Sequence, residues 1–148
     1  MAINSRAKGQ RGERAVADLL NVIIANLCIR LSVMPIPRLS RNLVQSQNGG
    51  HDLVGLDWLA IEVKWYAEIK SHLPRWWAQC LRQAEAVKAE PILIYKANGS
   101  KWQVRMYGRL EIEPGRRLRV PVDISWDDFA VWFERRCEVE LLKKIGID

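Results

Sequence analysis

Residues 49–65 read GGHDLVGLDWLAIEVKW, and this stretch decides the predicted fold. It contains two apolar-rich runs joined through Asp57, which predict a β-hairpin. The second run has the two-residue alternation of a strand, so Glu62 and Lys64 share one face. Asp52 begins the first run, on the neighbouring strand. The hairpin therefore allows three charged side chains to converge.

This combination of side chains favours metal-assisted chemistry. Two carboxylates that lie close together repel each other, and a hard divalent cation such as Mg²⁺, which takes oxygen ligands, relieves the repulsion. A lysine beside them stays charged. It is then suited to orient an attacking water or to neutralise charge on a phosphate in the transition state.

A second register of the same pattern remains open. Acidic-x-Lys triplets are common, and Asp57 followed by Glu68 and Lys70 fits almost as well. We favour the first register because residues 59–65 have strand patterning, whereas residues 68–72 read as an exposed connection before the next helix.

The flanking sequence predicts a mixed α/β sheet. Apolar residues at three- and four-residue spacing predict an amphipathic helix over residues 5–27, with Glu13 at the edge of its buried stripe. A strand, a helix that starts at Pro74 and a second strand form a βαβ unit, whose two strands should be parallel. The arginine-rich residues 116–119 follow in a loop or an edge strand.

We expect one domain over residues 1–148, with elements in the order α-β-β-β-α-β-β-α. In chain order the expected elements are a helix at 5–27, strands at 41–47, 52–56 and 59–65, a helix from Pro74 to the residue before Pro91, strands at 91–96 and 101–107, and a helix that opens at Ser125. This order predicts one mixed sheet with helices on its faces.

Composition points to a polyanionic partner and a reducing compartment. The 148 residues include 23 Lys plus Arg and 17 Asp plus Glu, a net charge of +6 with a pI near 9.5. Cys28, Cys80 and Cys137 are far apart and odd in number, which excludes a disulfide framework or a CxxC zinc set and predicts reduced thiols in the cytoplasm. The longest apolar stretch, residues 22–31, is too short to cross a membrane, and no signal peptide is predicted.

The order of these parts resembles the PD-(D/E)xK nuclease superfamily, in particular the archaeal-type Holliday junction resolvases and related phage-encoded nucleases. The resemblance rests on Glu13 in the first helix, the Asp52 hairpin, the triplet at residues 62–64 and a helix that leads into a buried parallel strand. It covers about residues 5–96. It implies a restriction-endonuclease-like fold, a Mg²⁺- or Mn²⁺-dependent endodeoxyribonuclease and a role in DNA recombination.

The resemblance implies a role for each residue that matches the motif. Asp52 and Glu62 correspond to the metal-binding carboxylates and Lys64 to the catalytic lysine. Glu13 corresponds to a first-helix glutamate that assists metal binding, and the carbonyl of Val63 commonly completes such a site.

Accessory positions match less fully. Arg41 and Ser46 stand where the resolvases have an arginine and a serine ahead of the aspartate, and Gln79 corresponds to a glutamine on the following helix. The gap from Arg41 to Asp52 is longer than usual, so the match of Arg41 and Ser46 stays open. His51 replaces the proline of the motif name, and the preceding glycine pair supplies a turn.

We expect DNA phosphates to contact basic side chains of the first helix and of the segment after it. These are Lys8, Arg11, Arg14, Arg38 and Arg41. Such contacts set position and salt dependence but not sequence preference. No recognition helix or zinc finger can be assigned to base edges.

The resemblance therefore implies a metal-dependent resolvase of four-way DNA junctions. Two symmetric cuts need two active sites, so a homodimer is expected. A phage-encoded protein of this kind acts in the host cytoplasm. Another PD-(D/E)xK nuclease, specific for flaps, nicks or duplex sites, and a basic nucleic-acid-binding module without catalysis remain as alternatives.

Overall fold

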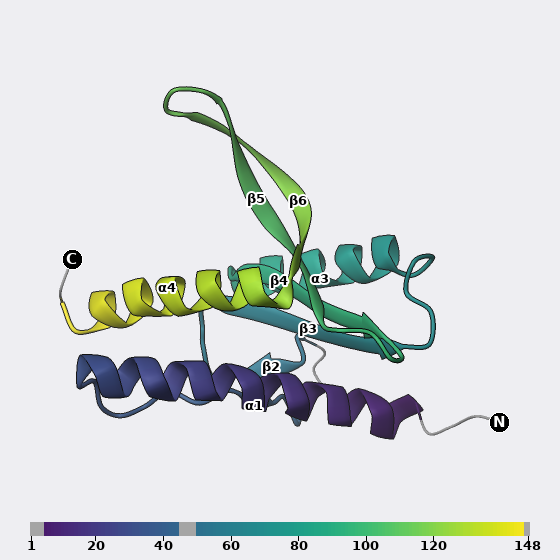
Figure 1. The fold of residues 1–148 in the computed structure, drawn as a ribbon, viewed down its shortest axis with the longest axis horizontal. Coiled ribbons are helices and arrows are strands. Elements are labelled where there is room, and N and C mark those ends of the chain that lie inside the picture. The colour runs from purple at the N-terminus through teal and green to yellow at the C-terminus, as the bar shows by residue number, and fades with distance from the viewer. Residues whose placement is uncertain (1–4, 45–49, 147–148) are drawn as a thin grey trace.

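The computed structural model describes residues 5–44 and 50–146, which form a six-stranded sheet flanked by helices (Figure 1). The helices in this part of the chain are α1 (Ser5–Leu31), α3 (Leu73–Val87) and α4 (Trp126–Lys144). The strands are β1 (Ser40–Arg41), β2 (Leu53–Val54), β3 (Leu59–Tyr66), β4 (Glu90–Ala97), β5 (Gln103–Glu113) and β6 (Arg116–Ser125).

The strands lie side by side in chain order, from β1 at one edge to β6 at the other. Strands β3 and β4 are parallel, because α3 carries the chain back across the sheet between them, and every other neighbouring pair is antiparallel. The predicted β2–β3 hairpin and the βαβ unit are thus confirmed, as is the mixed α/β fold class.

The predicted helix starts at Pro74 and Ser125 agree with the structure, but the predicted helix ends do not. Helix α3 ends at Val87, capped by Lys88 in the left-handed conformation, and Pro91 lies inside β4 instead of ending the helix. Pro74 lies in the first turn of α3, where its missing N–H costs nothing. The side chain of Ser125 caps α4 by accepting a hydrogen bond from the backbone N–H of Asp128 at 3.1 Å. Helix α1 continues to Leu31, beyond the predicted end at residue 27, because buried Cys28 extends its packed face.

The strands at the two edges of the sheet differ from the prediction. β1 has only two residues, whereas a strand over residues 41–47 was expected, and residues 45–49 lie outside the described part of the chain. β5 extends to Glu113 instead of residue 107, and β6 adds a strand to the predicted order. These extra residues need no core packing to form a strand, because each arm of the β5–β6 hairpin satisfies the backbone groups of the other.

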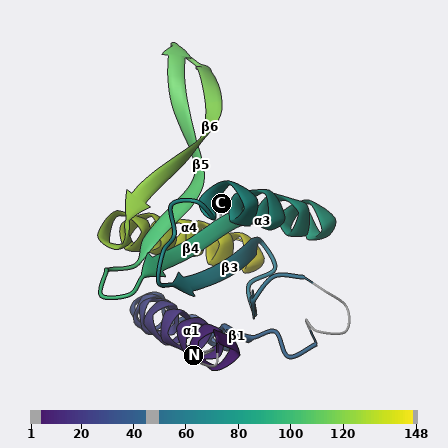
Figure 2. The same ribbon diagram turned by 90° about the vertical axis from the view of Figure 1, so that its right-hand side faces the viewer.

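The two-residue period of β3 sends its side chains into two environments. Ile61 and Val63 belong to a large apolar core between the sheet and helices α1 and α4. Glu62 and Lys64 point to the opposite face, which α3 covers through a smaller apolar cluster that includes Trp76. Helices α1 and α3 accordingly lie on opposite sides of β3 and β4 (Figure 2).

Cys28, Cys80 and Cys137 are all buried and free of disulfides. Within residues 5–44 and 50–146, no helix has the length and apolar character needed to span a bilayer.

Gly55 allows β2 to approach the segment before β1 closely. Its φ is +132°, and a Cβ at this position would lie 2.1 Å from the carbonyl oxygen of Arg38. An L side chain therefore meets both an unfavourable backbone conformation and a steric clash with backbone that cannot rotate away.

We predict that Gly55→Ala lowers the free energy of unfolding by about 2–3 kcal/mol, because of this strain. Gly9→Ala is the matched control: Gly9 lies within α1, and a Cβ there contacts nothing within 4 Å. Alanine at position 9 should stabilise the protein by about 0.5–1 kcal/mol. Chemical denaturation followed by circular dichroism measures both changes, and equal effects of the two substitutions would contradict the strain at Gly55.

Candidate active site

Asp52 and Glu62 are the two buried charged residues of the described part of the chain, with 6% and 1% of their surface exposed. The antiparallel pairing of their segments brings them together: the N–H of Asp52 donates to the carbonyl of Ile61 at 2.9 Å. The N–H of Val63 donates to Oδ2 of Asp52 at 2.8 Å. Strand β3 therefore fixes both the backbone and the carboxylate of Asp52.

The carboxyl group of Glu62 is held in an unfavourable environment for a negative charge. Burial, followed by the negative charge of Asp52, raises the pKa of Glu62 to about 9, although Lys64 opposes the shift. The Nζ atom of Lys64 lies 3.9 Å from Oε2 of Glu62. Oε1 of Glu62 is buried and has no hydrogen-bond partner, which is unusual for a polar atom in a protein interior.

Lys64 is positioned from the opposite side by α3. Its Nζ donates to Oε1 of Gln79 at 3.3 Å. Buried Trp76 and Cys80 anchor this side of α3 against the sheet, so Gln79 is directed toward β3. The structure thus brings the predicted accessory glutamine to the predicted lysine.

Glu13 enters the site from α1. Nε of Arg41 donates to Oε2 of Glu13 at 2.7 Å, and the Glu13 side chain is only 14% exposed. Burial raises the pKa of Glu13, and the charge of Asp52 adds to this effect while Arg41 opposes it. Arg41 was expected to contact DNA and to match an accessory arginine of the resolvases, and the structure places it in an ion pair with Glu13 beside the acidic site.

The donor atoms fit a divalent cation. Within the described residues, no group of three or more His, Cys, Asp and Glu side chains forms a ready-made metal cage. Mg²⁺ does not need one, because it is usually bound by one or two carboxylates with water and substrate oxygens. The adjacent carboxyls of Asp52 and Glu62, and the buried Oε1 without a partner, supply hard oxygen donors and an excess of negative charge.

The backbone N–H and C=O groups of Val63 point to the edge of β3 on which Asp52 lies. The N–H of Val63 points to Asp52, and the N–H and C=O of a strand residue point to the same strand edge. The Val63 carbonyl is therefore directed to the side on which Asp52 lies.

The alternative register does not bring its residues together. Asp57 is exposed and lies 3.8 Å from Lys144 at the end of α4. Glu68 instead accepts hydrogen bonds from the exposed Ser71, in the connection before α3, and Lys70 is exposed there.

The predicted DNA-binding residues are distributed over the surface near α1. Lys8 and Arg11 lie over the ring of Trp65, at 5.5 Å and 5.4 Å from its centroid. Arg14 and Arg38 are exposed. Ser46 lies outside the described residues.

Lys96, which the sequence analysis did not name, lies beside these basic residues: its Nζ is 4.2 Å from the centroid of the Trp65 ring and 5.0 Å from that of Trp102. Trp65 and Lys96 are partners in the parallel β3–β4 ladder. The predicted βαβ unit implied that these two strands are neighbours. The pairing of Trp65 with Lys96 could not be predicted, because the register of the two strands was not assigned from the sequence.

A buried aspartate beside a Glu-x-Lys strand, on a mixed sheet flanked by helices, is the arrangement expected of the PD-(D/E)xK class of nucleases. The chain belongs to the family described as "Phage putative PDDEXK endonuclease", which matches residues 4–113.

Individual proteins are also similar to this chain. Protein D14 of Escherichia phage T5 is 28% identical over 120 residues, a match that covers 72% of each chain. The solved structure of Hjc, a Holliday junction resolvase from Archaeoglobus fulgidus, superposes with a TM-score of 0.48 and 18% identity, over 84% of this chain and 96% of that one.

The raised pKa of Glu62 predicts how stability depends on pH in the metal-free protein. Between pH 4.5 and about 9 the folded chain keeps a proton that the unfolded chain releases, so the contribution of Glu62 to stability falls as pH rises. The expected slope is about 1.4 kcal/mol per pH unit. Glu62→Gln carries no such charge and should flatten the slope, leaving the variant more stable than the wild type at pH 8.

Urea denaturation in EDTA at pH 6, 7 and 8 measures this slope. Glu68→Gln is the control, because Glu68 is exposed and should leave the slope unchanged over this range. Parallel profiles for the wild type and Glu62→Gln would show that Glu62 is ionised in the folded, metal-free protein.

Proposed function

We propose that the protein is a divalent-metal-dependent endodeoxyribonuclease that hydrolyses phosphodiester bonds at the site formed by Asp52, Glu62 and Lys64. The observation that carries this proposal is the buried Oε1 of Glu62, which lacks a hydrogen-bond partner although its carboxyl group is beside that of Asp52. Membership of the endonuclease family supports it independently.

Asp52 and Glu62, with the Val63 carbonyl, would hold Mg²⁺ or Mn²⁺. Such a cation, when bound, lowers the pKa of a water ligand and offsets negative charge on the phosphate. Glu62 must release its proton to act as a ligand, so binding of the cation and ionisation of Glu62 are coupled. Glu13, which accepts a hydrogen bond from Arg41, adds a further carboxyl group from the α1 side.

Lys64 has a separate role in this proposal. Its ammonium group lies within 3.9 Å of Glu62 and is oriented by the side-chain oxygen of Gln79. A fixed positive charge at this position orients the attacking water or stabilises the charge that develops on the phosphate. Gln79 is thus a positioning residue that acts through Lys64.

The basic surface near α1 is proposed to hold the DNA. Its members are Lys8, Arg11, Arg14, Arg38 and Lys96. A net charge of +6 supports a polyanionic substrate. We infer that the protein acts on DNA in the cytoplasm of a bacterial host.

We predict that the protein cuts DNA in Mg²⁺ or Mn²⁺ and not in EDTA. Asp52→Asn and Glu62→Gln should each reduce the rate at least about a thousand-fold, because each removes a charged oxygen ligand worth several kcal/mol in the transition state. DNA binding should be retained in both variants. Gel-based cleavage and fluorescence anisotropy give the two measurements.

Asp57→Asn and Glu68→Gln are matched controls, since they make the same chemical changes at exposed positions. Both should cut at the wild-type rate. Loss of activity in these controls, with normal activity in the Asp52 and Glu62 variants, would transfer the site to the alternative register. A wild-type protein that binds DNA but does not cut it with any divalent cation would be a binding module without catalysis.

The proposed substrate is a four-way DNA junction, and the proposed role is in recombination. Support comes from the resemblance of residues 5–96 to archaeal-type resolvases. Each chain contributes one site of the kind described, so two symmetric cuts require a homodimer. Flaps, nicks and specific duplex sites are the competing substrates for the same chemistry.

A comparison of four-way junction, flap, single strand and duplex at one salt concentration tests the substrate. We predict at least about tenfold faster cleavage of the junction, equivalent to about 1.4 kcal/mol of preference in the transition state. Light scattering of the Glu62→Gln variant on the junction should show two chains per junction. Equal rates on all four substrates would exclude a resolvase while leaving a less selective nuclease.

A further inference from the structure

The hairpin formed by β5 and β6 projects from the body of the protein (Figure 1). The pairing of β4 with β5 reaches only to Met106, and beyond that residue the hairpin continues as a two-stranded ribbon to Glu113 and back from Arg116. Residues 107–113 span about 20 Å in an extended strand. The proposed nuclease chemistry does not use this arm.

One face of the ribbon continues the sheet face that carries the candidate active site. The strand registers align Glu62 with Leu93, Leu93 with Arg105, and Arg105 with Asp123. Residues paired directly across strands share a face, and each strand repeats every two residues. Further along the ribbon, that same face carries the pairs Tyr107 with Pro121, Arg109 with Arg119 and Glu111 with Arg117.

The outer part of this face carries excess positive charge. Arg109 and Arg119 are direct cross-strand partners, an arrangement in which like charges repel. Within the described residues, neither of them nor Arg117 forms an ion pair with a carboxylate. The guanidinium of Arg119 lies 4.2 Å from the centroid of the Tyr107 ring, which holds its charge over the ribbon. We name this group, Arg109, Arg117 and Arg119, the arginine face.

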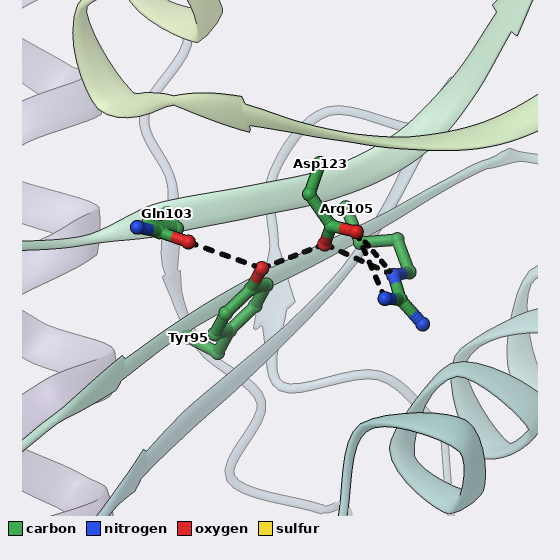
Figure 3. Close-up of polar contacts among 4 residues, drawn as sticks. All are labelled: Tyr95, Gln103, Arg105 and Asp123. Carbon is green, nitrogen blue, oxygen red and sulfur yellow. Dashed lines mark hydrogen bonds and ion pairs between the residues drawn. The ribbon is translucent and has the colours of Figure 1, made fainter. Parts of the chain in front are cut away.

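The base of the ribbon is held by a polar cluster on the same side (Figure 3). The hydroxyl of Tyr95 donates to Oδ1 of Asp123 at 2.6 Å, and the guanidinium of Arg105 donates to both carboxylate oxygens of Asp123. Burial acts to raise the pKa of Asp123, but the hydrogen bonds from Arg105 and Tyr95 hold it below its usual value. The ring of Tyr107 packs edge-on against Trp77 of α3. The direction of the ribbon is therefore fixed relative to the sheet.

We propose that the arginine face is a second DNA-binding surface, which holds the phosphates of a double-stranded arm of the substrate beyond the cleaved bond. This inference rests on the proposed function, because it takes DNA as the partner of the protein. A two-stranded ribbon fits a groove of duplex DNA, and unpaired arginines on one side match the phosphates that line the groove. The contacts position the duplex and carry no base preference.

The opposite face of the ribbon has a different character. Leu110, Ile112 and Leu118 are exposed there, by 56%, 57% and 51%. A second copy of this chain is the competing occupant of the hairpin, and the test below distinguishes it from DNA.

The test measures duplex binding of the full chain in EDTA, so that cleavage does not intervene. In the variant Arg109→Gln/Arg117→Gln/Arg119→Gln, affinity for a 30-base-pair duplex should fall at least about tenfold in moderate salt. The slope of log K against log salt should become shallower by about 2.7 if all three arginines contact phosphates. The thermal midpoint should stay close to that of the wild type, because removal of the repulsion between Arg109 and Arg119 offsets loss of the contact between Arg119 and Tyr107.

The matched control removes three positive charges from α4, which packs against the opposite face of the sheet: Arg135→Gln/Lys143→Gln/Lys144→Gln. Its affinity should change much less than that of the arginine-face variant. Equal losses of duplex affinity in the two triple variants would show that affinity depends on net charge alone, and this result would overturn the proposal. Wild-type affinity and salt slope in the arginine-face variant would also overturn it.

Two further measurements separate the possible causes of failure. If the arginine-face variant binds duplex normally but loses its oligomeric mass in light scattering, the hairpin binds a second copy and the proposal is wrong. A wild-type protein that never cuts DNA, yet binds it through the arginine face, would contradict the proposed nuclease and support the binding surface. With an active wild type, the arginine-face variant should show a raised KM and an unchanged kcat.

Discussion

The site depends on the burial of two acidic side chains next to each other. Asp52 and Glu62 approach closely because β2 and β3 are antiparallel and because the N–H of Val63 holds the Asp52 carboxylate against β3. Two buried carboxylates in contact are compatible with a stable fold only if a proton or a cation offsets their repulsion. Lys64, Gln79 and the Glu13–Arg41 pair lie around this acidic centre.

The side chains of β3 that stabilise the fold and those that form the candidate site alternate along the strand and point to opposite faces of the sheet. Strand β3 has β2 antiparallel on one side and β4 parallel on the other, so its centre is enclosed. Its apolar side chains complete the core under α1 and α4, while Glu62 and Lys64 face α3. A one-residue slip of β3 would bury Lys64 in the apolar core and remove Glu62 from Asp52. The large core therefore also fixes the alignment of the site.

Much of this arrangement could be predicted because it is encoded in local periodicity. Alternation placed Glu62 and Lys64 on one face of β3, and helical spacing placed Glu13 beside the buried stripe of α1. The Glu13–Arg41 ion pair could not be predicted, since it depends on how α1 packs against β1. The length of the β5–β6 hairpin was missed because its outer residues form a strand through mutual pairing alone, without a core to impose a pattern.

The hairpin also has an implication for self-association. Both long edges of its outer part expose backbone groups that could template another strand, the first step in fibre formation. Pro121 removes one N–H donor from the β6 edge, and the charges at Arg109, Arg117 and Arg119 disfavour stacking of identical ribbons. The basic residues that repel each other within the arm therefore also oppose edge-to-edge pairing of two identical arms, which would bring like charges together.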